Sequence, residues 1–167
     1  MLALALMTSV GAKAQFEQGT MHANASLSGL DINYTSAKHL TLGVQGLVGY
    51  SLLDNLMATA SCDFRTSDGY RDYLGFGVGG RYYILQNGIY LGAGCKYAHV
   101  GTQFYEEDDK IYSRKKYDDF LPYLEVGYAF FISRTVTIEP AIYYEHSLKD
   151  NSEYSKIGFR LGFGIYL

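Results

Sequence analysis

The chain has 167 residues, a net charge of -3 and 19% charged residues. This length suits one domain, and the slightly acidic balance argues against a nucleic-acid partner, which would require clustered positive charge. The chain contains 19 glycines and 17 tyrosines but only two prolines and no tryptophan. No run of about 18 apolar residues occurs, so the sequence predicts no transmembrane helix in the mature protein.

The first residues resemble an export signal. Leu2 to Met7 form an apolar stretch, and Ala12-Lys13-Ala14 before Gln15 matches the small-residue pattern of a cleavage site. We therefore predict that residues 1–14 are a signal peptide and that residues 15–167 form the folded domain. A short buried amino-terminal helix is the alternative interpretation.

Eight later segments alternate between two kinds of residue with a period of two, which is the period of β-strands. The segments are 21–29, 40–50, 56–64, 74–84, 89–97, 120–130, 136–144 and 157–167. One face of each segment carries only uncharged, mostly apolar residues and glycine, as in Leu40, Leu42, Val44, Gly46, Val48 and Tyr50. This separation of the two faces indicates that each face meets a different environment.

The opposite face carries charges interleaved with glycine. Its ionisable residues are Asp63, Arg65, Arg81, Lys96, Glu125, Glu139, Glu145, Lys156 and Arg160. A membrane barrel must be apolar toward lipid, while its lumen can be polar, so we predict that these residues form an ion-pair network inside a barrel. An eight-stranded barrel is just wide enough for side chains to fill, which predicts a plugged lumen. A narrow solute channel, and a soluble barrel that encloses an apolar ligand, remain alternatives.

The connections between segments alternate between short and long. The short connections contain Asp54-Asn55, Asn87-Gly88 and Ser133-Arg134. The first two pairs are residue types that favour tight turns. The longer, polar connections are 31–38, 66–71, 102–119 and 147–154. This alternation predicts an up-and-down barrel with all long loops at one end.

Aromatic residues lie near both ends of the apolar face. Such positions predict two girdles of amphipathic rings at the two headgroup layers of a bilayer. The girdle near the short turns consists of Tyr50, Tyr82, Tyr128 and Phe130, and the girdle near the long loops consists of Phe64, Tyr97, Phe120 and Tyr144.

With these features the chain resembles the small eight-stranded outer-membrane barrels of the OmpA/OmpX type, over residues 16–167. The alternating stretch from Phe159 to Leu167 looks like the carboxyl-terminal signal of such barrels, although Leu167 stands where an aromatic residue is commonest. The resemblance implies an all-β, eight-stranded antiparallel up-and-down transmembrane β-barrel in the bacterial outer membrane. It implies contact with outer-membrane lipid, lipopolysaccharide and the barrel-assembly machinery.

The connection 102–119 is the most distinctive predicted surface. Its aromatic and charged residues include Phe104, Tyr105, Glu106, Glu107, Asp108, Asp109, Arg114, Lys115 and Lys116. Charge runs are usually solvated loop, and the alternatives are binding of divalent cations or lipopolysaccharide phosphates, or an extended hairpin that contacts an extracellular or outer-membrane protein. We predict a structural or surface-interaction role.

Glu145-His146-Ser147 is the one candidate for catalysis, because some small outer-membrane barrels are lipid-modifying enzymes. Neighbouring residues of a strand point to opposite faces, so these three cannot form a proton relay as adjacent residues. We therefore predict no enzyme activity, with a lipid hydrolase or acyltransferase as the alternative. The four histidines lie on different segments, so no metal or cofactor site is predicted.

Overall fold

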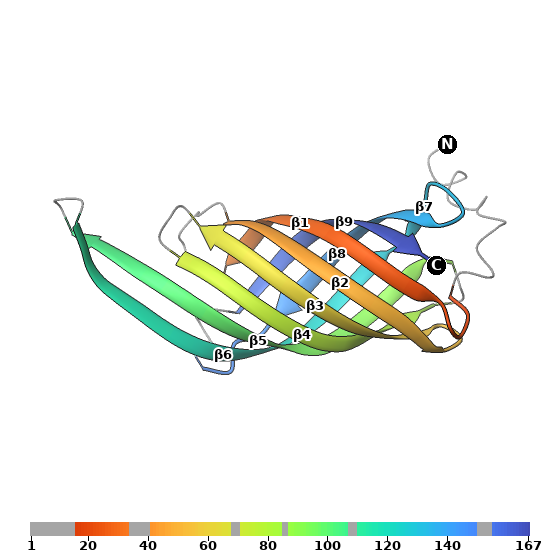
Figure 1. The fold of residues 1–167 in the computed structure, drawn as a ribbon, viewed down its shortest axis with the longest axis horizontal. Helices are drawn as coiled ribbons and strands as arrows, with labels where there is room; N and C mark the ends of the chain where they lie inside the picture. Colours follow the sequence, from red (N-terminus) through yellow and green to blue (C-terminus); the bar gives the residue numbers. More distant parts are fainter. Residues whose placement is uncertain (1–15, 34–40, 68–70, 85–86, 107–109, 150–154) are drawn as a thin grey trace.

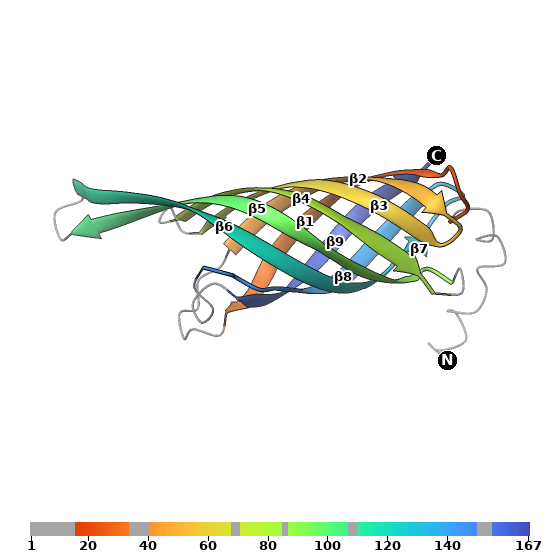
Figure 2. The ribbon, with the colours of Figure 1, turned by 90° about the horizontal axis from the view of Figure 1, so that it is seen from below.

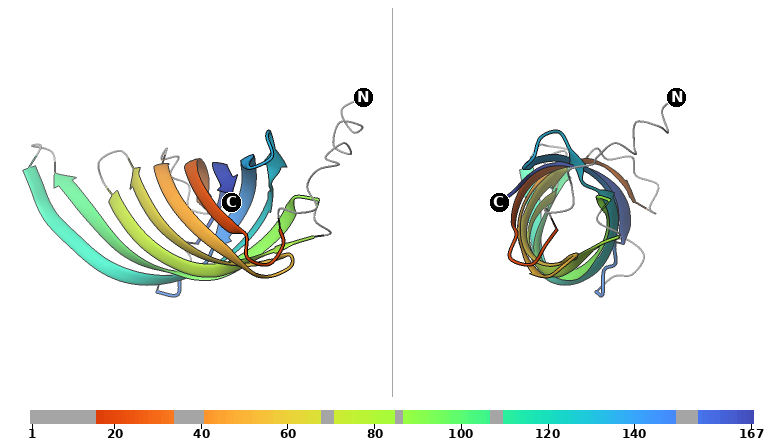
Figure 3. Two further views of the ribbon diagram at one scale, coloured as in Figure 1. Left: turned by 45° about the vertical axis from the view of Figure 1, so that its right-hand side comes forward. Right: turned by 90° about the vertical axis from the view of Figure 1, so that its right-hand side faces the viewer.

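The computed structural model describes residues 16–33, 41–67, 71–84, 87–106, 110–149 and 155–167. These residues form one antiparallel sheet that closes on itself, as the view along its axis shows (Figure 3). Its strands are β1 (Met21–Asn33), β2 (Thr41–Leu53), β3 (Leu56–Ser67), β4 (Arg71–Tyr83), β5 (Ile89–Glu106), β6 (Lys110–Tyr128), β7 (Phe130–Phe131), β8 (Val136–Glu145) and β9 (Lys156–Tyr166). Within these ranges no helix is long and apolar enough to cross a membrane.

Strands that follow one another in the chain are neighbours in the barrel, and β1 pairs with β9 to close it. β8 pairs with both β6 and β7, and its register is the same for both, from Tyr123↔Glu145 through Gly127↔Ala141 to Phe130↔Ile138. β6 and β7 are therefore two parts of one sixth strand. The predicted eight-stranded up-and-down barrel is confirmed.

The two faces of the wall have the predicted environments. On the outside, Val48, Val78 and Leu124 are each more than 60% exposed, whereas Lys96 and Glu145 in the lumen are at most 1% exposed. A soluble barrel with an apolar interior would have the opposite arrangement, so the structure excludes that alternative. The exposed apolar face is a surface that lipid solvates better than water.

The short turns lie at the end of the barrel that also holds the carboxyl terminus (Figures 1 and 2). In the β2–β3 turn, Asn55 adopts a positive φ of 66°, a conformation that asparagine tolerates better than most residues. Gly88, before β5, has a φ of 92°, which favours glycine because it has no Cβ. Tight turns at these points fix the register of the hairpins they join.

β5 and β6 continue much further than predicted. The segment 102–119 was expected to be a polar loop, but the two strands stay paired as far as Glu106↔Lys110, and the hairpin projects beyond the barrel at the end opposite the short turns (Figure 1). The loop prediction is therefore wrong, and the extended hairpin is what forms. The physical reason is that two antiparallel strands pair the backbone groups that face each other without a third strand, while the groups on the outer edges can bond to water.

Several predictions concern residues that the structure does not describe, so they stay predictions. Residues 1–14 and most of the other long connections lie outside the described residues. In the hairpin, residues 107–109 and the side chains of Phe104, Tyr105, Glu106, Arg114 and Lys115 also lie outside them.

Candidate functional site

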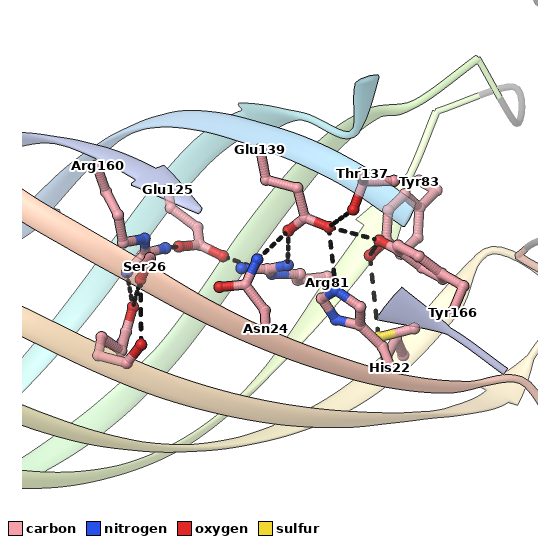
Figure 4. A network of polar contacts seen from close by, with 12 residues as sticks. His22, Asn24, Ser26, Arg81, Tyr83, Glu125, Thr137, Glu139, Arg160 and Tyr166 are labelled. Atoms are coloured by element: carbon pink, nitrogen blue, oxygen red, sulfur yellow. Dashed lines mark hydrogen bonds and ion pairs between the residues drawn. The ribbon is translucent and has the colours of Figure 1, made fainter. Parts of the chain in front are cut away.

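The half of the lumen near the short turns holds a network centred on Glu139 of β8 (Figure 4). The Glu139 carboxylate is 2% exposed and lies within hydrogen-bond distance of groups from β1, β4, β8 and β9. These partners are His22 at 3.0 Å, Asn24 at 3.0 Å, Arg81 at 3.0 Å, Thr137 at 2.8 Å and Tyr166 at 3.2 Å. A buried carboxylate is tolerated only when it is paired and hydrogen-bonded in this way.

Arg81 extends this network across the lumen. Its Nε donates to Glu125 of β6 at 2.8 Å, and Glu125 also pairs with Arg160 of β9. Arg160 in turn donates to Gln45 of β2. We call Arg81, Glu125, Glu139 and Arg160 the inner network, and through it six strands are joined inside the barrel.

A second group lies nearer the projecting hairpin. Arg65 donates to both oxygens of Glu145 at 2.7 Å, and Lys96 lies 2.8 Å from Glu145 and 3.1 Å from Asp63. Lys156 completes the group at 3.6 Å from Glu145. These five residues are the outer network. The structure thus brings the nine predicted lumen residues together as two networks instead of one.

Tyrosine rings fill the space between these charges. The Arg81 guanidinium lies 4.3 Å from the centre of the Tyr90 ring, and Lys96 Nζ lies 5.1 Å from that of Tyr123. Cations over aromatic faces gain electrostatic attraction in a desolvated site. In the described part of the lumen, cationic side chains therefore lie against tyrosine rings as well as against carboxylates.

Some lumen residues were not predicted. Asp119 is 4% exposed and accepts a hydrogen bond from Ser147 Oγ at 2.5 Å, and His22 is 2% exposed beside Glu139. Asp119 and His22 each lie between outward-facing neighbours, so the period-two alternation could have placed both side chains in the lumen. Phe16 is fully buried and stacks on Tyr83 with ring centres 4.0 Å apart. It precedes β1, and no periodicity marks it.

The predicted girdle residues all lie on the outer face. Near the short turns Tyr50, Tyr82 and Phe130 are 46–52% exposed, and Tyr128 packs beside Phe130 with ring centres 6.4 Å apart. Near the hairpin end the exposed rings are Phe64, Tyr97, Phe120 and Tyr144. The wall thus carries aromatic rings at both ends of its apolar face.

A polar cluster lies just beyond the girdle on the hairpin. His99 Nδ1 is 2.7 Å from Asp118 Oδ1, and Lys149 Nζ donates to the Asp118 backbone carbonyl at 3.2 Å. The hydrogen bond with His99, followed by one from the Tyr97 hydroxyl, lowers the pKa of the exposed Asp118 carboxyl. This cluster marks where β6 leaves the barrel wall.

The candidate catalytic residues do not meet. Glu145 points into the lumen and binds Arg65, whereas the Ser147 hydroxyl donates to Asp119. His146 Nδ1 lies 3.2 Å from the hydroxyls of Tyr144 and Ser155. No proton relay joins Glu145, His146 and Ser147.

The β6 edge of the hairpin has no neighbouring strand within the described part of the chain. The β6–β8 ladder begins at Tyr123↔Glu145, and the backbone bond of Leu148 to Phe120 is the outermost one that follows. Even-numbered residues of β6 direct their backbone groups to this side, as the accepting carbonyls of Phe120 and Pro122 show. Lys149 Nζ occupies the Asp118 carbonyl on this side, so from Lys110 to Tyr117 the backbone of the strand presents an open edge.

No family model matches the sequence, and no curated protein matches it. Solved structures do match its fold. The amino-terminal β-barrel domain of Pseudomonas aeruginosa OprF has a TM-score of 0.65 at 14% identity, over 90% of this chain and 98% of that one. Neisserial surface protein A has a TM-score of 0.62 at 13% identity, over 89% and 95%.

The attachment invasion locus protein Ail of Yersinia pestis has a TM-score of 0.58 at 12% identity, and the match covers 90% of this chain and 99% of Ail. Identities this low show the fold alone. The chain has the fold of the small eight-stranded barrels of the bacterial outer membrane.

Proposed function

We propose that this protein is an integral outer-membrane barrel with a lumen closed to solutes, and that it binds a surface partner along the β6 edge of its projecting hairpin. The apolar belt between two aromatic girdles supports contact with outer-membrane lipid and lipopolysaccharide. The alternating β9 supports insertion by the barrel-assembly machinery. A binding role, with no catalytic step, fits the separation of Glu145, His146 and Ser147.

The closed lumen is supported by the two networks. Arg81, Lys96, Glu139 and Glu145 are each at most 2% exposed, so water scarcely reaches them. An ion pathway would have to separate these buried pairs, at a cost of about 3–5 kcal/mol for each partner removed. In planar bilayers we expect no sustained conductance above the bare membrane. A stable open level would contradict the closed lumen.

The open edge of β6 is the observation that carries the binding role. An unpaired edge is a template on which an extended segment adds as a further strand. The strand carries Lys110, Arg114, Lys115 and Lys116 in its sequence, which favours an acidic partner. We therefore propose that the partner is an extended, acidic segment of another protein.

The test separates backbone pairing from charge at a single position. The backbone N–H of Lys116 points toward the open edge. The substitution Lys116→Pro therefore removes one hydrogen-bond donor from the edge and leaves the β5–β6 ladder intact. Lys116→Ala removes only the charge. The probe is a labelled ten-residue peptide of alternating valine and glutamate, titrated against the protein in lipid nanodiscs.

We expect Lys116→Pro to weaken peptide binding about tenfold or more, because it removes a hydrogen bond and introduces a clash. Lys116→Ala should weaken it about threefold at most, as one exposed charge contributes little. Equal losses in both variants would mean that charge alone attracts the peptide, and strand addition would be wrong. Tyr117→Pro, which disrupts the hairpin ladder, serves as the positive control.

A further inference from the structure

The segment before β1 folds back into the mouth of the barrel at the short-turn end. Glu17 to Thr20 form a four-residue turn, in which the Thr20 N–H donates to the Glu17 carbonyl at 3.2 Å. Gly19 is the third residue of this turn and has a φ of 92°, as a type II turn requires at that position. The turn reverses the chain, and Phe16 therefore enters the lumen.

Three aromatic rings from separate strands surround Phe16. Its ring stacks on Tyr83 of β4, with ring centres 4.0 Å apart and planes at 17°. Phe131 of β7 lies at 5.7 Å and Tyr166 of β9 at 5.5 Å, both in edge-to-face arrangements. Aromatic pairs favour such edge-to-face contacts. We call Tyr83, Phe131 and Tyr166 the aromatic seat.

The aromatic seat lies directly against the inner network. The Tyr83 hydroxyl is 2.9 Å from the Tyr166 hydroxyl, which donates to Glu139 at 3.2 Å. Met57 is fully buried in the same apolar cluster as Phe16, and the Tyr83 hydroxyl is 3.9 Å from its sulfur. Phe16 and the seat therefore separate the inner network and Met57 from the mouth.

The segment that carries Phe16 is held less firmly than the strands of the wall. The Phe16 carbonyl accepts from the Asn55 N–H at 2.8 Å, and the hydrogen bonds of Gln18 to the β2–β3 turn are exposed. Nearer to β1, backbone bonds with Ser51 extend the β1–β2 ladder. Segments held by solvent-exposed hydrogen bonds open locally at low free energy. Residues 16–20 can therefore leave the mouth while the barrel stays folded.

An unpaired nitrogen next to the seat favours the open mouth. His22 Nε2 lies 3.0 Å from Glu139, and the His22 ring stacks on Tyr166 with ring centres 4.3 Å apart. Its Nδ1 is buried and has no hydrogen-bond partner among the described residues. A buried polar atom without a partner costs free energy, and water that enters an open mouth would bond to it. The closed mouth thus gives up one hydrogen bond that the open mouth regains.

We propose that Phe16 is a reversible plug. The mouth at the short-turn end is a binding site for one aromatic ring, and the chain's own Phe16 fills it. Withdrawal of residues 16–20 opens this half of the lumen to water as far as Glu139. The two networks still block the axis, so the inference rests on the proposed closed lumen but not on partner binding by the hairpin.

Oxidation of Met57 by hydrogen peroxide, followed by mass spectrometry of the detergent-folded protein, tests the plug. We expect Met57 to be oxidised about tenfold faster or more in Phe16→Ala, because the burial and the aromatic contacts of the ring are lost. Met21 is 58% exposed on the outer wall and should react at the same rate in both proteins. If Met57 stays protected in Phe16→Ala, Phe16 is not the plug.

Gly19→Ala disturbs the turn but leaves Phe16 and the seat unchanged, so it tests the plug even if Phe16→Ala does not fold. A methyl group on Gly19 meets no atom within 4 Å, and its effect comes from the φ of 92°, which alanine adopts poorly. We expect Met57 oxidation to rise about fivefold, the effect of about one residue forced into the left-handed region. Gly46→Ala is the matched control, because Gly46 is equally open but has no positive φ. Equal oxidation in the two glycine variants would show that the turn does not hold the ring in place.

Rescue by a free aromatic molecule tests the binding site. Toluene at about twice its dissociation constant should slow Met57 oxidation in Phe16→Ala about threefold, because it fills the vacated seat. Methylcyclohexane has a similar size but no aromatic electrons and should protect less. Equal protection by the two molecules, or protection by neither, would show that the seat is not a site for aromatic rings.

Reversibility is tested in the unmodified protein by adding urea below the unfolding transition. Local withdrawal of residues 16–20 exposes little surface, so the rate of Met57 oxidation should depend only weakly on urea. A rate that rises in parallel with global unfolding would mean that Phe16 leaves only when the barrel unfolds. In planar bilayers Phe16→Ala should show no sustained conductance. A stable open level would contradict the closed lumen, whereas Met57 oxidation decides the plug, so the two failures are distinguishable.

Discussion

At the scale of single residues, the structure depends on charges that have no access to water. Glu139 is the clearest case, since it accepts from five side chains while 2% exposed. Glu139→Gln keeps the shape but removes the charge that balances Arg81. We expect the free energy of unfolding to fall by about 3 kcal/mol, because one partner of a buried pair is left uncompensated. Urea titration of the detergent-folded protein measures this loss.

Glu17→Gln is the control for this prediction, because Glu17 is exposed near the barrel end and should change the unfolding free energy by less than about 0.5 kcal/mol. If Glu139→Gln unfolds at the same urea concentration as the unmodified protein, the inner network adds no stability.

Asp118 allows a prediction at the surface. Its pKa is lowered by the His99 hydrogen bond and then by Tyr97, so the ionised form is favoured in the folded protein. A depressed folded pKa contributes stability above the unfolded pKa and loses it as pH falls through the folded one. We expect the Asp118 carboxyl to titrate below the range of a free aspartate, and His99→Gln to raise its pKa. Carbon NMR of the labelled carboxyl follows both, and identical titrations would show that the bond is absent in solution.

At the scale of strands, Gly79 and Gly94 pair directly in the β4–β5 ladder, and Tyr123 lies over them. A Cβ on Gly94 would overlap the Tyr123 ring and the Val78 carbonyl. Because backbone cannot move aside cheaply, we expect Gly94→Ala to destabilise the barrel by about 1–3 kcal/mol. Gly46→Ala is the matched control, since nothing lies within 4 Å of its added methyl.

Urea unfolding of the two glycine variants decides this prediction. Destabilisation in Gly94→Ala with little change in Gly46→Ala would establish that Tyr123 needs the glycine pair. Equal stability of the two variants would mean that the lumen relaxes around the methyl group.

Strand faces were predictable because period-two alternation directly reports which side of a wall each residue occupies. Arg81 and Glu139 could therefore be placed in the lumen, but their pairing could not, since it depends on the register of distant strands. The extent of β5 and β6 beyond residue 102 was missed because charged residues such as Glu106 were interpreted as loop. The break in pairing after Tyr128 was not predicted either, because the alternation of the sequence continues through Phe130.

At the scale of the whole molecule, the three regions have separate physical supports. The wall is held by backbone ladders and lipid contact, the lumen by its two networks, and the hairpin mainly by the β5–β6 ladder (Figure 2). A change in one region should therefore leave the others intact. In particular, the hairpin edge can be altered without weakening the barrel.

Heat modifiability on gels tests this independence. A closed barrel resists unfolding by dodecyl sulfate until it is heated, so the unboiled protein should migrate differently from the boiled one. We expect Glu139→Gln and Gly94→Ala to lower the conversion temperature by several degrees, since about 1 kcal/mol shifts the melting temperature of a domain of this size by roughly 2–4 °C. Lys116→Pro should leave it unchanged, because Lys116 lies beyond the last β6–β8 bond. If the conversion temperature of Lys116→Pro fell as far as that of Glu139→Gln, the hairpin would be supporting the barrel. Its β6 edge would then have a structural role and would not be available to a partner.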